Sequence, residues 1–308
     1  MTGTPAPNDE TEYWAQMRLV SEDLPKSFFA FRNIYFELQK AGKPFNGGYS
    51  KQDLQKAFTW GFKYSLSEKK RDEFYRKINP HIFRALKKDC LDLPEQTDEI
   101  REVSLSDKQM AIYKEMKRHM ITEIEGNQIV AQVALTKLMK LRQITSGFAI
   151  SPEGEPHETL DNSKLNELTD ILDEIGNKQV IIWCQFHKEF EMISKLLKSF
   201  TTLYALTKDK DRSIDDFKSG QAQYLIAHPR SAGHGLTFTN CSTSVYFSQD
   251  YSFEAFEQSR GRIHRPGQND KCTYIYLLAK GTIDEDIHKA IKHKESLQVL
   301  YDRITNTK

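Results

Sequence analysis

From about residue 160 onward, short apolar segments alternate with longer amphipathic ones. Residues 179–184 (QVIIWC), 222–228 (AQYLIAH) and 272–279 (CTYIYLLA) are nearly continuous apolar segments of strand length. Such segments are typical of strands buried on both faces of a sheet, and intervening helices favour parallel strands. The pattern therefore predicts an α/β fold in which helices cover both faces of a parallel sheet, a three-layer sandwich.

The amphipathic segments have the spacing of helices with one buried face. In residues 163–176, leucine and isoleucine recur every three or four positions, and Gly176 suits the end of a helix. Further helices are predicted over 187–200, 211–220 and 281–300, and further strands over 201–206 and 242–249. The acidic residues Asp284, Glu285 and Asp286 admit a metal site as one interpretation. At the start of a helix, however, they favour a role in complementing the helix dipole.

The first part of the chain has a different character. Residues 1–103 are rich in aromatic residues and lysine, with a glycine-containing loop at 41–50 between helical stretches. Residues 104–159 predict two helices: Ser106 is a suitable cap, and apolar residues recur at helical spacing after it. We therefore divide the chain into segments 1–103, 104–159 and 160–308.

The composition limits the classes of protein to which this chain can belong. The 308 residues include 44 Lys and Arg against 43 Asp and Glu, so any nucleic-acid binding depends on a local patch rather than on net charge. The four cysteines form no Cys-x-x-Cys pair and no zinc cluster with histidine, so we expect no metal site, and buried thiols in a reducing compartment. The sequence shows neither a signal peptide nor an apolar stretch of about 18 residues, so we expect a cytoplasmic protein without a membrane partner.

The segment 254–268 (EAFEQSRGRIHRPGQ) carries the clearest candidate chemistry. If it is helical, Gln258, Arg262 and Arg265 lie on one face. Two guanidiniums that point the same way suit phosphate oxygens, since arginine stays charged and its planar fork matches them. The alternative is a solvated basic helix end. The Pro266-Gly267 pair favours the phosphate site, because it presents the arginines at an element's end, where α/β folds bind ligands.

The same segment resembles motif VI of helicase superfamily 2, and its HRPGQ ending resembles the form found in Swi/Snf-type ATPases. Residues 228–240 (HPRSAGHGLTFTN) resemble motif V, residues 180–186 resemble motif IV, and residues 281–287 resemble the closing segment of the same lobe. The motifs occur in the family's order and at its distances. This resemblance implies that residues 160–308 form a RecA-like C-terminal helicase lobe.

The resemblance also implies roles for individual residues. Arg262 and Arg265, with Gln258, would act as catalytic arginine fingers and their partner. Three glycines of motifs V and VI would lie near the nucleotide, because glycine allows close backbone approach. They are Gly233, Gly235 and Gly261. An ordinary glycine turn is the alternative. His234 admits either a packing role or a phosphate contact. Candidates for the DNA backbone are Arg230, Ser231, Thr237, Gln185 and His187.

Residues 2–8 (TGTPAPN) resemble motif III of the first RecA-like lobe, which makes 1–103 the tail of that lobe and 104–159 the family's helical insertion. The sequence contains no Gly-x-x-x-x-Gly-Lys-Ser/Thr phosphate loop and no Asp-Glu-x-His or Asp-Glu-x-Asp motif. We therefore expect ATP and Mg²⁺ to bind only when a first lobe is supplied, in cis by a longer protein or in trans by a partner, and neither to bind to this chain alone.

These observations predict the C-terminal half of an ATP-dependent translocase or helicase on double-stranded DNA, of phage or bacterial type and inactive as an ATPase by itself. The resemblance favours translocation over strand separation. The alternative is a non-catalytic DNA- or protein-binding module that keeps the helicase-lobe fold. A nuclease is not supported, because the sequence has no His-Asn-His motif, paired carboxylates or metal-ligand cluster.

Overall fold

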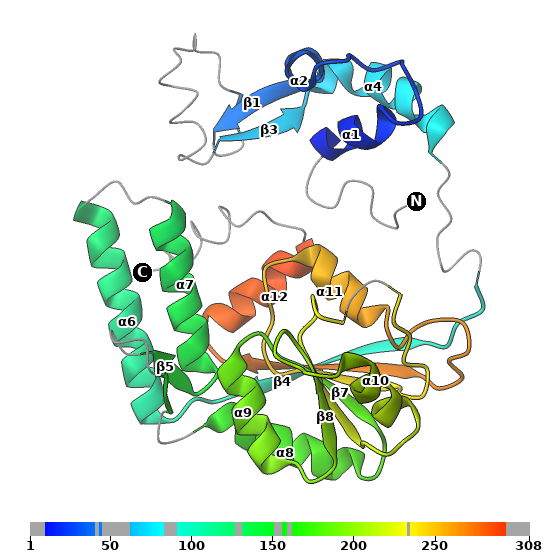
Figure 1. Ribbon diagram of the computed structural model, residues 1–308. Helices are drawn as coiled ribbons and strands as arrows, with labels where there is room; N and C mark the ends of the chain where they lie inside the picture. Colours follow the sequence, from blue (N-terminus) through cyan, green and yellow to red (C-terminus); the bar gives the residue numbers. More distant parts are fainter. Residues whose placement is uncertain are drawn as a thin grey trace. The chain divides into compact units, whose positions relative to one another are not determined.

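The computed structural model describes residues 10–40, 43–44, 62–82, 91–126, 131–150, 156–158, 162–232 and 235–293. The chain divides into two compact units, Met1–Cys90 and Leu91–Lys308 (Figure 1). The predicted motif III at 2–8, and Gly233 and His234 of motif V, lie outside the described residues.

The first unit combines short helices with a small antiparallel sheet of order β2-β1-β3. Helices were predicted in this part of the chain, but this sheet was not. Phe31, Tyr35 and Phe74 are at most 1% exposed and form the centre of an aromatic core. The elements are η1 (Glu10–Glu12), α1 (Tyr13–Met17), α2 (Phe28–Tyr35), β1 (Phe36–Lys40), β2 (Lys43–Pro44), β3 (Phe62–Leu66), η2 (Glu68–Lys70), α4 (Arg71–Ile78) and η3 (Asn79–His81).

The second unit is built on a parallel sheet of six strands in the order β4-β11-β10-β7-β9-β8, which confirms the predicted parallel sheet. In register, Trp183 of β7 lies between Ala227 of β9 and Tyr246 of β10. These three strands therefore end side by side at one edge. The strands are β4 (Gln96–Val103), β7 (Val180–Trp183), β8 (Phe200–Leu203), β9 (Tyr224–Ala227), β10 (Thr243–Tyr246) and β11 (Cys272–Ala279).

Helices cover both faces of this sheet. Side chains that alternate along each strand divide the core into two layers: Ile181 and Trp183 pack on the face of α7, α10, α11 and α12, whereas Val180 and Ile182 pack on the face of α8 and α9 (Figure 1). The helices are α6 (Asp107–Gly126), α7 (Ala131–Thr145), α8 (Ser163–Ile175), α9 (His187–Leu196), α10 (Lys210–Lys218), α11 (Phe253–Arg260) and α12 (Ile283–His293), with a hairpin of β5 (Phe148–Ile150) and β6 (Pro156–Glu158) after α7.

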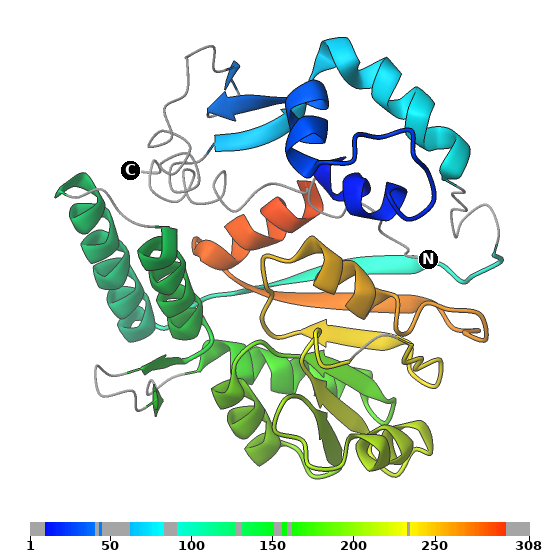
Figure 2. The ribbon, with the colours of Figure 1, turned by 45° about the horizontal axis from the view of Figure 1, so that its top comes forward.

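The second unit begins earlier than the expected boundary at residue 103. Strand β4, which we had placed in the first segment, pairs along its whole length with β11 (Figure 2). Of its residues only Val103 is buried, since the others alternate between exposed and half-buried. The sequence of β4 is therefore too polar to indicate a strand of a buried parallel sheet.

Candidate functional site

Three loops meet at the carboxyl edge of the sheet, because β10, β7 and β9 are neighbours that end together. Gln185 and His187 follow β7, Arg230 and Ser231 follow β9, and Asp250 follows β10. We call these five residues, with His228, the carboxyl-edge cluster. Four of them are predicted DNA contacts, and the structure places all four on neighbouring loops. Thr237 lies elsewhere, as described below.

The loop after β7 is held by a buried carboxylate, Glu189, in the first turn of α9. Its Oε2 accepts hydrogen bonds from the backbone N–H of Gln185 at 2.7 Å and of Phe186 at 3.0 Å, and from Ser248 Oγ at 2.8 Å. Ser146 Oγ donates to Oε1 at 2.6 Å. This arrangement fixes the backbone that carries Gln185 and His187, and leaves the His187 side chain exposed at the helix start.

The loop after β9 turns back on itself at His228. His228 Nδ1 accepts a hydrogen bond from Arg230 N at 3.2 Å, and the exposed Arg230 guanidinium donates to Asp250 Oδ2 at 2.9 Å. Burial lowers the pKa of His228, against the effect of Asp250, and the positive charges of the neighbouring Arg230 and Arg142 lower it further. Within the carboxyl-edge cluster, Asp250 is therefore the one carboxylate among several basic groups.

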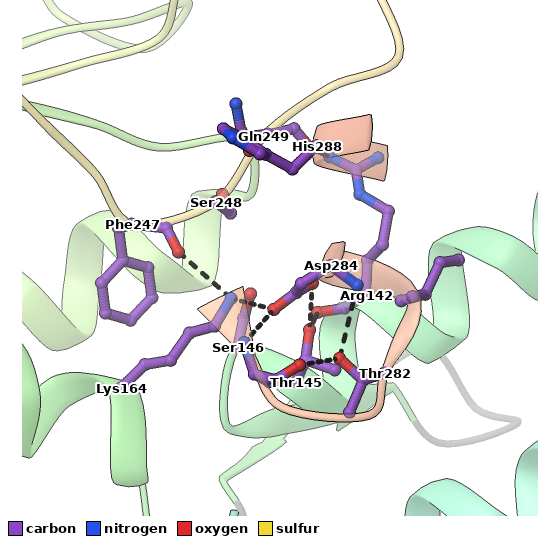
Figure 3. Close-up of polar contacts among 12 residues, drawn as sticks. Arg142, Thr145, Ser146, Lys164, Phe247, Ser248, Gln249, Thr282, Asp284 and His288 are labelled. Atoms are coloured by element: carbon purple, nitrogen blue, oxygen red, sulfur yellow. Dashed lines mark hydrogen bonds and ion pairs between the residues drawn. The ribbon is translucent and has the colours of Figure 1, made fainter. Parts of the chain in front are cut away.

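A buried ion pair lies behind this edge (Figure 3). Lys164 of α8, which is 0% exposed, places Nζ 2.5 Å from Asp284 Oδ2 and donates to Phe247 O at 3.2 Å. Asp284 Oδ1 accepts from Thr145 Oγ1 at 2.9 Å, and Oδ2 accepts from Ala279 N at 3.2 Å. These contacts join α7, α8 and α12 to the ends of β10 and β11.

The acidic start of α12 is therefore occupied by contacts within the protein. Besides the Asp284 ion pair, Glu285 Oε1 accepts from Gly281 N at 3.1 Å. No group of His, Cys, Asp and Glu side chains that could hold a metal occurs among the described residues. Lys164 was not predicted as the partner of Asp284, because the two residues are far apart in the chain.

The predicted helical face of Gln258, Arg262 and Arg265 is wrong, because α11 ends at Arg260 and both arginines lie in the turns that follow. Gly261 caps the helix with an ordinary φ of −66°. The Gln258 amide donates to Glu254 of its own helix at 2.9 Å. The three residues are thus close in sequence but do not form one helical row.

The two arginines nevertheless share a site, which we call the arginine loop (residues 261–268). Arg262, 3% exposed, donates from Nη1 to Leu236 O at 3.1 Å. Arg265 donates from Nε to Gly261 O at 2.8 Å and from Nη1 to Thr237 Oγ1 at 3.0 Å. Thr237 therefore lies beside Arg265 and not in the carboxyl-edge cluster.

Within the described part of the chain, neither arginine of this loop takes part in an ion pair, and the buried Nε of Arg262 has no hydrogen-bond partner. Burial lowers the pKa of Arg262, and the neighbouring charge of Arg265 lowers it further. The charges of the two arginines thus repel each other, and neither is balanced by a carboxylate among the described residues. An incoming anion would relieve this repulsion.

The arginine loop lies toward the amino ends of the strands, away from the carboxyl edge. Gln268 Nε2 donates to Cys241 O, just before β10, at 2.8 Å. His264 Nε2–H donates to Pro94 O at 2.9 Å, and Gln96 Nε2 donates to His264 Nδ1 at 3.0 Å, which fastens the loop to the start of β4. His264 and Gln268 belong to the HRPGQ segment, but no role for either was predicted from the sequence.

Gly235 of motif V has a backbone conformation that favours glycine. Its φ is +96°, in a region that other residues rarely adopt, and a side chain there would meet no atom within 4 Å. It precedes Leu236, whose carbonyl accepts the hydrogen bond from Arg262. Gly235 is therefore next in sequence to a residue that contacts the arginine loop.

Comparison with known proteins gives this arrangement a class. Residues 1–147 match the SNF2-related domain, and residues 163–267 match the helicase conserved C-terminal domain. With the six-stranded parallel sheet, these matches define a RecA-like C-terminal helicase lobe preceded by part of an SNF2-related domain. The chain belongs to the Swi/Snf-type ATPases of helicase superfamily 2.

Two relatives illustrate the match. The chain is 26% identical over 309 residues to protein p41 of Acyrthosiphon pisum secondary endosymbiont phage 1, covering 97% of this chain and 63% of p41. It is 26% identical over 324 residues to the SWI/SNF chromatin-remodeling complex subunit snf22 of Schizosaccharomyces pombe, covering 96% of this chain and 18% of snf22. The chain thus spans less than two thirds of each relative.

Solved structures show the same fold. The Sulfolobus solfataricus SWI2/SNF2 ATPase core in complex with dsDNA aligns with a TM-score of 0.54 and 21% identity, covering 99% of this chain and 62% of that one. The C-terminal part of the Fun30 ATPase domain aligns with a TM-score of 0.56 and 18% identity, covering 70% of this chain and 98% of that one. None of the described helices is long and apolar enough to span a membrane.

Proposed function

We propose that this chain is the C-terminal, arginine-bearing part of an ATP-driven translocase on double-stranded DNA. The observation that carries the proposal is Arg262, a buried guanidinium that has no carboxylate partner among the described residues and is repelled by Arg265. A buried cation without a counterion is costly, so an incoming anion is the natural partner. In a family of ATPases, that anion is the nucleotide's phosphate.

In this proposal Arg262 and Arg265 stabilise the charge that develops on the transferring γ-phosphoryl group. Gln258 borders the same site, and Gly233, Gly235 and Gly261 allow the backbone to come close to the nucleotide. A first lobe with a phosphate loop supplies the remaining phosphate contacts and holds Mg²⁺. We assign residues 1–103 to the tail of that lobe and 104–159 to a helical insertion, with β4 added to the second lobe.

The carboxyl-edge cluster is the proposed DNA contact. Arg230 is exposed, and Gln185, His187 and Ser231 lie on neighbouring loops. The dsDNA named for the Sulfolobus relative supports duplex DNA as the ligand. Arginine, glutamine and backbone groups on such loops suit phosphate oxygens and carry no base sequence, which fits movement along DNA.

ATP turnover tests the nucleotide part of the proposal. We expect no ATPase activity from the chain alone, with or without duplex DNA, and DNA-stimulated activity when it is combined with a Swi/Snf-type first lobe that carries a phosphate loop. Turnover by the pure chain that Arg262→Ala abolishes would contradict the first expectation. DNA binding without any turnover, even with a competent first lobe present, would favour the non-catalytic binding module.

Fluorescence anisotropy with a labelled duplex tests the DNA part. We expect binding that weakens steeply with salt, and Arg230→Gln should lower the slope of log K against log salt by about 1, as the loss of one phosphate contact does. The exposed Arg212 on α10, whose side chain is 76% exposed, offers a matched control. An equal loss of slope in Arg212→Gln would place the DNA elsewhere.

A further inference from the structure

Arg142 is a buried residue that contacts the loops of the carboxyl-edge cluster from the protein interior. It comes from α7, near the end of that helix, and is 5% exposed. Its guanidinium carbon lies 5.0 Å from the ring centroids of both Phe186, in the loop after β7, and Tyr251, in the segment after β10. Its Nη2 donates to the carbonyl of Gln249, toward which the side chain extends in Figure 3.

Arg142 also shares a carboxylate with Arg230. Asp250 Oδ1 is 3.9 Å from Arg142 Nη1, and Asp250 Oδ2 is 2.9 Å from Arg230 Nη2. The Asp250 side chain is 20% exposed, whereas that of Arg142 is 6% exposed. One buried cation therefore contacts the loops after β7 and β10 directly, and the loop after β9 through Asp250.

We propose that Arg142 is a positioning residue for the carboxyl-edge cluster. It fixes the conformation of the loops that carry Gln185, His187 and Arg230, and it offsets the charge of Asp250. The inference rests on the proposed DNA contact at this edge. Arg142 itself is buried and touches no phosphate. It acts through Phe186, Tyr251 and Asp250.

The chemistry of arginine accounts for both effects. A planar guanidinium can lie against aromatic rings on two sides and still donate in its own plane, which an ammonium cannot do. The ion pair of Arg142 with Asp250 is long, at 3.9 Å, so burying this cation lowers the stability of the fold. Packing alone would therefore favour an apolar side chain at this position. Without Arg142, Arg230 alone would offset the negative charge of Asp250, so the pair would attract an approaching phosphate less.

Duplex binding by the whole chain tests the inference, with Arg142→Gln and Arg142→Lys as variants. We expect Arg142→Gln to raise Kd about tenfold with the salt slope unchanged, because no phosphate contact is lost, in contrast to Arg230→Gln. Arg142→Lys keeps the charge but loses the ring stacking, so its Kd should lie between those of wild type and Arg142→Gln. Circular dichroism and thermal unfolding identify the temperature at which all variants are folded.

Hydrogen–deuterium exchange without DNA separates this inference from the proposed function. We expect faster exchange of residues 184–187 and 248–251 in folded Arg142→Gln, whether or not the chain binds DNA. Three results for Arg142→Gln would each overturn the inference: exchange in both segments as slow as in wild type, a duplex affinity equal to that of wild type, or a salt slope reduced as in Arg230→Gln. If the wild-type chain fails to bind duplex while the exchange changes as expected, the positioning role stands and the DNA contact fails.

Discussion

Two regions of the second unit differ in how the charges of their cations are paired. At and behind the carboxyl edge, Lys164 is paired with Asp284, and Arg142 and Arg230 share Asp250. In the arginine loop, Arg262 and Arg265 donate to carbonyl and hydroxyl oxygens and belong to no ion pair of the described residues. The loops at the two ends of β10 are separated by a strand about 13 Å long.

Under the proposed function, the difference bears on what each region would bind. A cation that already has a carboxylate is available to a phosphate only in part, which would suit loops that must release DNA as the protein moves along it. A buried cation without a carboxylate gains much more from an anion, which suits stabilisation of the charge that develops in a transition state. Charge pairing, rather than the number of basic residues, distinguishes the regions.

The largest expected effect is on ATP turnover. In the chain combined with a competent first lobe, Arg262→Ala should lower kcat about 10³-fold or more, as the loss of an arginine finger does, while the duplex affinity stays near the wild-type value. Steady-state ATPase assays and anisotropy on the same samples measure both. Equal losses of turnover and DNA binding would show that the two regions are not functionally separate.

Chemical denaturation of the chain alone should show the next largest effect. Lys164→Met leaves the Asp284 carboxylate buried without its cation and should lower the free energy of unfolding by about 3–5 kcal/mol. Arg262→Met removes a cation that leaves no carboxylate behind, so its unfolding free energy should stay within about 1 kcal/mol of wild type or rise. Arg212→Gln, which breaks the exposed pair with Asp216, should change it by about 0.5 kcal/mol or less. A loss in Arg262→Met as large as in Lys164→Met would contradict the contrast.

The smallest expected effect concerns Asp250. Asp250→Asn keeps the shape of the side chain but removes the one carboxylate of the carboxyl-edge cluster, so duplex affinity should rise a few-fold, in line with about 1 kcal/mol for one charge at about 4 Å in high dielectric. The increase should be largest at low salt. Weaker binding by this variant would mean that Asp250 orients Arg230 more than it neutralises it.

The sequence predicted the layers of the second unit well, because its strands and helices are long enough to show their own periodicity. Helix α8 follows the predicted range closely, and Ser106 accepts a hydrogen bond from Gln109 N at 3.2 Å at the start of α6. The strand β4 was missed because its sequence is mostly polar and only Val103 is buried. Its place in the sheet depends on β11, which lies far away in the sequence.

The site was predicted less completely, for a local reason and a long-range reason. Pro266 disfavours helical backbone just before it, and Arg262 O accepts from Phe238 N, so the chain turns after Arg260 and the helical spacing of the arginines has no meaning. The pairs Lys164–Asp284 and Arg142–Asp250 join elements whose contact only the fold creates. Residue types at the edge could be predicted, but their charge partners could not.

The pairing of β4 with β11 has a mechanical consequence. The chain enters the second unit at Leu91 and joins the sheet at Gln96, where β4 runs parallel to β11 in unbroken register as far as Val103. A pull on the chain before Leu91 therefore acts along the strand axis and loads the ladder in shear, so that its hydrogen bonds resist together instead of opening one after another. Because the Arg260 guanidinium binds Asp98 at 2.5 Å, part of such a force would pass directly to the end of α11. The segment that enters this lobe is thus anchored along the direction in which a pull would act.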